Sequence, residues 1–153
     1  MATETDAVVD SRTGFADWQA GVAGGVVGAA VMAALVVAMS PPTITVAIPA
    51  LYGLSGGAAG ITVHMTHGAV LGVGLAAVLR FAPVSESSTV LVVGAGLVWG
   101  VLTWVALAAL VMPVWLGAVG FPNAPPLPNF AIPSLLWHAV YGGVLGVVYG
   151  VLR

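Results

Sequence analysis

The sequence predicts an all-α integral membrane protein in which four transmembrane helices are arranged as two similar helical hairpins. Of its 153 residues, 60% are hydrophobic and 5% are charged, whereas a soluble domain usually carries about 25% charged residues. The apolar residues gather in four runs, each of roughly the 20 residues that a membrane-spanning helix needs. The runs are continuous rather than alternating, which excludes a membrane β-barrel, and their hydrophobicity excludes intrinsic disorder.

The four apolar runs lie in a single transmembrane domain over residues 18–153, which follows an acidic tail over residues 1–17. Proline closes two of the runs, because its ring is not accepted in a helix interior: the first run stops before Pro41 and the third at Pro113. Arginine closes the other two. We therefore expect helices at residues 21–39, 58–79, 90–112 and 132–152.

The charged residues all lie on one predicted side of the membrane. One arginine precedes the first helix, one separates the second helix from the third, and one ends the fourth. The connections over residues 40–57 and 113–131 carry no charge. By the positive-inside rule, both termini are cytoplasmic and the chain is a multi-pass protein of the cell membrane. The charged residues are Arg12, Arg80, Arg153, Glu4, Asp6, Asp10, Asp17 and Glu86.

The same composition excludes several function classes. Without cysteine the chain forms neither a disulfide nor a thiolate metal site. Its three scattered arginines form no basic patch, so we expect the lipid bilayer and no nucleic acid as a partner. No expected helix carries a charge in its interior, which argues against ion-coupled transport. A catalytic constellation and a nucleotide-binding motif are also missing from the sequence, so we lean away from an enzyme.

The two uncharged connections are apolar, rich in Pro and Gly, and too broken to span a membrane. Irregular backbone cannot face lipid, because its N–H and C=O groups would have no partners. We expect these connections to lie along the membrane surface and favour this interpretation over re-entrant segments, which the sequence leaves open. Tyr52, Trp115 and Phe121 would then anchor them in the interface.

The two halves of the chain look related. An offset of 72 or 71 residues aligns glycines, prolines and histidines of the first hairpin with those of the second. This pattern predicts a parallel repeat about an axis along the membrane normal. The matches pair Gly24, Gly28 and Pro41 with Gly96, Gly100 and Pro113, and Ile61, His67 and Gly72 with Ile132, His138 and Gly143.

Glycines recur every four residues in all four expected helices, as in Gly21 and Gly25 or Gly96 and Gly100. Such stripes let helix backbones approach closely where no hydrophobic effect drives association in lipid. We therefore expect the glycines to be packing residues, and the same faces to be able to form a homo-oligomer.

His64, His67 and His138 are the only ionisable side chains expected inside the membrane. We favour neutral imidazoles that hydrogen-bond across helices. A second interpretation makes His67 and His138 the axial ligands of a haem b between facing helices. A third has all three histidines bind Cu or Zn, and a pH sensor is the remaining alternative. The cofactor is thus unknown, and neither haem b nor Cu/Zn is favoured.

Two segments carry a resemblance to a known set of proteins: IPALYGLSGGAAGITVHMTHGAVLG (residues 48–72) and IPSLLWHAVYGGVLGVVYG (residues 132–150). With the absence of Lys and the acidic tail, the chain resembles uncharacterised small four-span membrane proteins of halophilic archaea over residues 12–153. Such proteins are sometimes automatically labelled histidine kinase. The residues do not support that label, because the histidines lie in membrane spans and no nucleotide-binding domain accompanies them.

The sequence therefore predicts a polytopic membrane protein that is a non-enzymatic component or an oligomeric module. Two alternatives stay open. One is a bis-histidine haem b or Cu/Zn protein that serves electron transfer in the membrane. The other is a small channel or carrier for a neutral solute, lined by the histidines and their neighbouring threonines.

Overall fold

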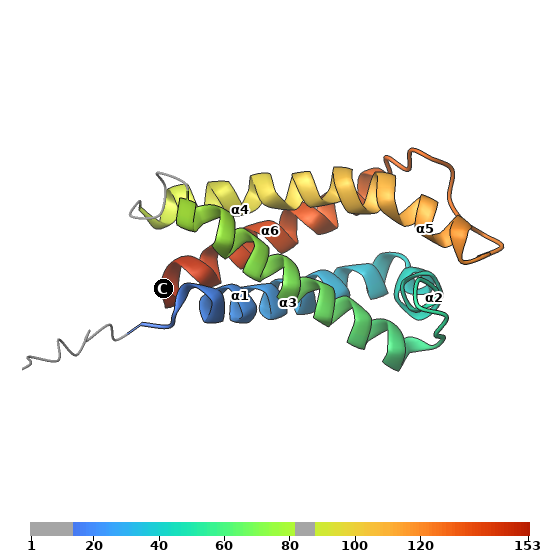
Figure 1. Ribbon diagram of the computed structural model, residues 1–153, viewed down its shortest axis with the longest axis horizontal. Coiled ribbons are helices and arrows are strands. Elements are labelled where there is room, and N and C mark those ends of the chain that lie inside the picture. Colours follow the sequence, from blue (N-terminus) through green and yellow to red (C-terminus); the bar gives the residue numbers. More distant parts are fainter. Residues whose placement is uncertain (1–13, 82–87) are drawn as a thin grey trace, which may run out of the picture.

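The computed structural model describes residues 14–81 and 88–153, and these form helices without a strand (Figure 1). Four helices are long and apolar enough to cross a membrane. Three of them are α1 (Asp17–Met39), α3 (Gly57–Phe81) and α6 (Ile132–Leu152). The fourth is a composite helix, Thr89–Ala118, built from α4 (Thr89–Thr103), η2 (Trp104–Val111) and α5 (Met112–Ala118). The prediction of four long apolar helices is confirmed.

Most helix ends lie within a few residues of their predicted positions. The start of α1 is four residues early, at Asp17, because the Gln19 side chain accepts a hydrogen bond (3.1 Å) from the Ala16 N–H ahead of the first turn. A carboxylate in that turn also suits the positive end of the helix dipole. Of the charged residues, Asp17, Arg80 and Arg153 are described, and Arg12, Glu4, Asp6, Asp10 and Glu86 lie outside the described residues.

The third span does not end at Pro113, contrary to the sequence prediction. The helix passes through this proline and continues to Ala118. The turns before Pro113 are widened into a π-helix, in which the Met112 N–H bonds to the Leu107 carbonyl, five residues back. The wider turn relieves the contact between the proline ring and the preceding carbonyls. A proline can therefore lie within a span whose hydrogen bonds have shifted by one residue.

The first connection is also more regular than expected. The helix breaks at Ser40, and a new helix starts at Pro41 and Pro42, where prolines are accepted because the first N–H groups of a helix have no partner. This helix contains η1 (Thr43–Ala47) and α2 (Ile48–Ala50), and Figure 1 shows it turned away from the direction of α1. The segment is nevertheless none of the four helices long and apolar enough to cross a membrane, as predicted.

The glycine stripes hold the helices together in pairs. In the first hairpin, the stripe of α1 that contains Gly21 and Gly25 faces Gly68 and Gly72 of α3 backbone to backbone. A methyl group at Gly21 would lie 2.7 Å from the Gly72 carbonyl oxygen, which is closer than side chains are found. In the second hairpin, glycines of α4 and α6 meet in the same way, namely Gly96, Gly100, Gly142 and Gly146.

The two hairpins join through α1 and α6. Gly24 and Gly28, on another face of α1, lie against Leu145 and Tyr141 of α6. Extensive contacts thus run from α3 to α1, from α1 to α6 and from α6 to α4. The glycine faces are occupied inside the chain, while a homo-oligomer through such faces stays a prediction. The parallel repeat also stays a prediction, although each expected hairpin is formed.

Trp99 links α4 to α3. Trp99 donates its indole N–H to the Leu71 carbonyl (3.1 Å), and its ring lies against Gly74. Beyond Trp99, towards the uncharged connections, α3 and the composite helix diverge (Figure 1). We call this end of the bundle the uncharged end and the opposite end, with Asp17, Arg80 and Arg153, the charged end.

Candidate functional site

A cavity of about 320 Å³ lies where α3 diverges from the composite helix, towards the uncharged end. Every long helix contributes to its wall, and η1 and α5 close it at the end of the bundle. All three histidines line it, so the structure brings His64, His67 and His138 to one place. The volume is at the lower end of the range for small-molecule pockets, about 300–1,000 Å³. We call this space the histidine cavity.

His64 is buried and hydrogen-bonds across the first hairpin. Its Nε2 lies 3.0 Å from the Ala29 carbonyl oxygen on α1. A carbonyl oxygen can only accept, so Nε2 carries the hydrogen and Nδ1 of the neutral ring is a hydrogen-bond acceptor. This is the cross-helix bond that the favoured interpretation of the histidines expects.

His138 is held in the opposite tautomer. Its Nδ1 lies 2.7 Å from the carbonyl oxygen of Ser134, one turn earlier on α6. Nδ1 therefore carries the hydrogen, and Nε2 of the neutral ring is an acceptor that points away from that carbonyl. The partner is thus on the same helix as His138, and not on a facing helix as expected.

The free nitrogens of these two rings reach accessible space. In the described part of the chain, Trp104 Nε1 is the only buried side-chain nitrogen or oxygen that lacks a hydrogen-bond partner. His64 Nδ1 and His138 Nε2 also have no hydrogen-bond partner among the described residues, so they are not buried atoms, and both rings line the cavity. Two hydrogen-bond acceptors are therefore available to an occupant of the cavity.

His67 belongs to the rim of the cavity at the uncharged end. Its Nε2 lies 2.7 Å from the Tyr52 hydroxyl, and the Tyr52 ring packs edge-on against Trp115 with 5.4 Å between ring centres. Tyr52 follows α2, whereas Trp115 is on α5, so this aromatic rim joins the outer parts of the two hairpins. Both aromatics were expected as interfacial anchors, but the contact of Tyr52 with His67 was not anticipated.

Apolar side chains make up most of the remaining wall. Met32, Val36, Leu71, Leu107 and Met112 are among them. Tyr141 and Trp137 also line the cavity, but their polar hydrogens are already used, by the Gly68 carbonyl (2.8 Å) and by the Met39 sulfur (3.1 Å). The cavity therefore offers an apolar space with few polar groups, and these include no charged side chain.

The cofactor predictions find uneven support in this geometry. Within residues 14–81 and 88–153, no group of three His, Cys, Asp or Glu is placed to hold a metal ion. His138 has the tautomer of many metal-ligating histidines, with Nδ1–H on a carbonyl and Nε2 free. His67 has its Nε2 on Tyr52, and an axial bond to haem iron through that nitrogen would break this contact. The haem b and Cu/Zn hypotheses stay predictions.

Comparisons with protein-family models, with curated proteins and with solved structures found no match. The resemblance to small four-span proteins of halophilic archaea stays a prediction. The function is therefore argued from the histidine cavity itself.

Proposed function

We propose that the chain is a multi-pass protein of the cell membrane that binds a small, neutral, largely apolar molecule in the histidine cavity. The four apolar helices support membrane insertion. The observation that carries the binding function is the pair of histidines with opposite, carbonyl-determined tautomers, His64 and His138, whose remaining nitrogens are acceptors beside an apolar space. This proposal refines the alternative of a channel or carrier for a neutral solute.

The cavity selects for a hydrogen-bond donor. An acceptor that is desolvated without a partner costs about 1–3 kcal/mol, so a purely apolar occupant would leave the imidazole nitrogens uncompensated. A hydroxyl group supplies the missing donor. A cation is disfavoured, because no carboxylate lines the cavity to balance its charge. The ligand class is therefore a neutral alcohol or phenol with an apolar body.

The mouth of the cavity opens among exposed apolar side chains. Val70, Leu107 and Val111 line the cavity and are also exposed, Val70 to 63%. In a bilayer these side chains face lipid, because no water-facing surface of this kind is stable. The ligand would then enter sideways from the lipid phase, which suits a molecule that partitions into membranes.

A substitution that fills the histidine cavity with a larger side chain tests whether the ligand binds there. Ala108 lines the histidine cavity on η2, while Ala106, on the same helical segment, is exposed outside it. We expect 1-naphthol to raise the Tm of the detergent-solubilised protein more than naphthalene, which lacks the hydroxyl donor. Ala108→Phe should abolish the difference and Ala106→Phe should keep it.

Removal of the His138 acceptor is the second test of ligand binding. His138→Leu should reduce the 1-naphthol effect to that of naphthalene, whereas Leu136→Ala, an exposed position on the same helix, should not. Equal effects of the two probes on the wild-type protein would refute the hydrogen-bond selection. A 1-naphthol effect that survives Ala108→Phe would place the binding outside this cavity.

The orientation is part of the same proposal. The positive-inside rule places the charged end, with both termini, in the cytoplasm. Reporter fusions at either terminus should be active only as cytoplasmic reporters, and a terminus found outside would overturn the orientation.

The tautomer of His138 favours one further candidate, a haem b or metal ion bound at its free Nε2. The purified protein would then show a Soret band or bound Cu or Zn that is lost in His138→Ala. A colourless, metal-free preparation from cells supplied with haem and metals would eliminate this candidate.

A further inference from the structure

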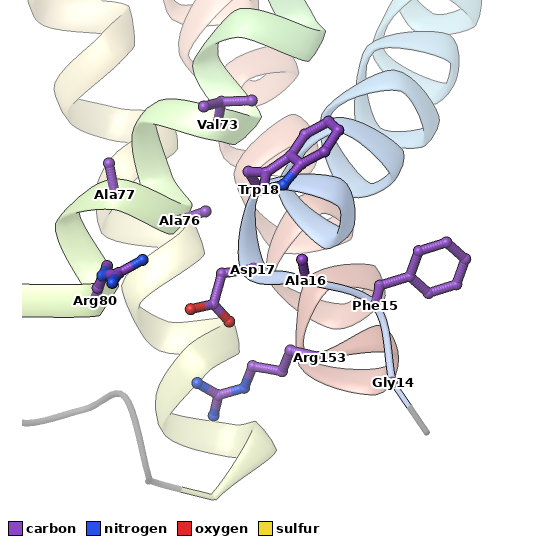
Figure 2. A pocket seen from close by; sticks show the side chains of 10 residues that line it. All are labelled: Gly14, Phe15, Ala16, Asp17, Trp18, Val73, Ala76, Ala77, Arg80 and Arg153. Carbon is purple, nitrogen blue, oxygen red and sulfur yellow. The ribbon is translucent and has the colours of Figure 1, made fainter. Parts of the chain in front are cut away.

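A second and larger cavity, of about 700 Å³, lies at the charged end of the bundle. Figure 2 shows it between the start of α1, the last turns of α3 and the end of α6. Its polar side chains are Asp17, Arg80 and Arg153, one from each of these helices, and Trp18, Val73 and Ala77 form part of its apolar wall. We call it the arginine cavity.

The lining side chains carry more positive than negative charge. Arg80 and Arg153 are two cations, and Asp17 is the single carboxylate among the lining side chains. Arg153 is positioned by the ring of Tyr149, with its guanidinium carbon 5.5 Å from the ring centre. In Figure 2, Arg153 approaches the Asp17 carboxylate, and Arg80 lies on the other side of that carboxylate.

Arg80 is the cation available to a ligand. It lies in the last turn of α3, is exposed, and forms no hydrogen bond or ion pair with another described residue. A guanidinium presents a planar set of donors that matches a phosphate oxygen pair. Two such groups line one cavity, one of them unengaged by the described part of the protein, and together they suit an anion with several oxygens.

The apolar wall indicates what is attached to that anion. Val73 and Ala77 continue along α3 towards the bundle centre, and Trp18 is exposed at the start of α1. Tryptophan at this level is typical of the membrane interface. A ligand with a phosphate at the arginines and hydrocarbon along Val73 and Ala77 would satisfy both parts of the cavity.

We propose that the arginine cavity binds the phosphate of an anionic phospholipid, with an acyl chain along α3. Basic pockets between membrane helices on the cytoplasmic side are suited to such headgroups. The inference rests on the membrane insertion proposed above, but it does not depend on ligand binding in the histidine cavity.

Native mass spectrometry of the full chain tests this proposal. The protein is mixed with equal amounts of phosphatidylglycerol and phosphatidylcholine. We expect phosphatidylglycerol to be retained at least about tenfold better than phosphatidylcholine, and Arg80→Gln to reduce this preference about fivefold. Arg80→Lys, which keeps the charge and loses the planar donors, should fall between the two. A wild-type protein without preference would overturn the proposal.

Two controls distinguish lipid binding in the arginine cavity from a non-specific attraction between the protein and anionic lipids. Arg12→Gln removes the same charge from the same predicted side of the membrane, and we expect it to keep the preference. An equal loss in Arg12→Gln and Arg80→Gln would overturn the assignment to the cavity. Millimolar inorganic phosphate should leave the lipid bound, because phosphate lacks the acyl chain. Displacement would assign a free-anion site instead of a lipid site.

The outcomes also distinguish the two proposals. Arg80→Gln should leave the effect of 1-naphthol on Tm unchanged, since Arg80 lies at the opposite end of α3 from the histidine cavity. Loss of phosphatidylglycerol preference with an intact 1-naphthol effect concerns the arginine cavity alone. A wild-type chain that retains neither phospholipid, with an intact 1-naphthol effect, would overturn the arginine cavity as a lipid site and leave the histidine cavity untouched.

Discussion

The two hairpins use the same local devices but build different outer ends. Each pairs its long helices through glycines, and each has a π-helix directly before an X-Pro pair, Ile48-Pro49 in the first hairpin and Met112-Pro113 in the second. In the first hairpin the helix breaks at Ser40 and turns away before its π-helix. In the second hairpin the helix continues without a break to Ala118. The π-helix accompanies the proline in both hairpins, whereas the change in helix direction occurs in the hairpin that breaks at Ser40.

In both hairpins, the backbone carbonyl that loses its donor to a proline accepts a hydrogen bond from the loop that follows. Proline has no N–H for the carbonyl four residues back. In the first hairpin that carbonyl, of Thr45, accepts from the Gly56 N–H (3.1 Å), and in the second the Ala109 carbonyl accepts from the Asn129 N–H (2.9 Å). The returning loop thus supplies the missing donor. A proline is accepted within the helix because the loop that follows supplies a donor for the backbone carbonyl.

Helix length explains why the second loop must travel further. The composite helix has 30 residues and α6 has 21, so α6 starts about 13 Å short of the end of its partner at 1.5 Å per residue. The chain returns along the composite helix over residues 119–131, and this brings Asn129 to Ala109. Four prolines in this segment remove N–H groups that would otherwise need partners there: Pro122, Pro125, Pro126 and Pro128.

The hairpins also differ in which of them supplies the donors of the hydrogen bonds between them. Three side-chain hydrogen bonds between the hairpins run from an aromatic donor of the second hairpin to an acceptor of the first. Trp99 bonds to Leu71, Trp137 to Met39 and Tyr141 to Gly68. The histidines of the first hairpin instead bond within that hairpin, His64 to Ala29 and His67 to Tyr52.

We expect the largest effect from substitutions in the glycine contacts that both hairpins share. Gly25→Ala and Gly96→Ala would each push a methyl group into a facing backbone carbonyl, of Gly68 and Gly142 respectively. We expect each to destabilise the protein by about 2–3 kcal/mol, because overpacking against backbone leaves nothing flexible to move. Denaturant unfolding in micelles measures the loss. Gly94→Ala, with nothing near the new methyl group, is the control and should be neutral or stabilising. A loss confined to one hairpin would contradict the equivalence of the two pairings.

A smaller effect tests the loop donor of the second hairpin. Asn129→Pro removes the N–H that the Ala109 carbonyl accepts, and Ala109 is fully buried. We expect about 1–2 kcal/mol of destabilisation from the unsatisfied carbonyl. Asn129→Ala keeps the N–H and serves as the control in the same unfolding experiment. Equal stability of the proline and alanine variants would show that water or another donor replaces the bond.

The smallest effects compare bonds within and between hairpins. Tyr141→Phe removes the buried donor to the Gly68 carbonyl, and Tyr52→Phe removes the exposed contact with His67. Hydrogen bonds inside membrane proteins are worth about 0.6 kcal/mol on average. We expect about 1 kcal/mol for Tyr141→Phe and about 0.5 kcal/mol for Tyr52→Phe. A larger loss at Tyr52 would make the aromatic rim, and not the buried bond, the stronger junction.

The candidate site was only partly predictable from the sequence. His64, His67 and His138 stand out because the expected helices hold no acid, Lys or Arg in their interior. Their partners do not stand out: Ala29 acts through its backbone, and Tyr52 reaches His67 across a turn of the first connection. Thr62 and Thr66, the threonines next to the histidines in the sequence, bond to carbonyls of their own helix, one turn back.

The sequence by itself determined the number of long apolar helices, and it placed their ends to within a few residues except at Pro113. It could do so because a continuous apolar run and its closing residues are local properties of the chain. The course of the helix through Pro113 depended on the returning loop, since only the tertiary structure brings the Asn129 N–H to the carbonyl of Ala109. The histidine cavity was likewise decided by the tertiary structure, because it lies where α3 and the composite helix diverge. The angle between two helices that are distant in sequence cannot be inferred from the local sequence pattern of either one.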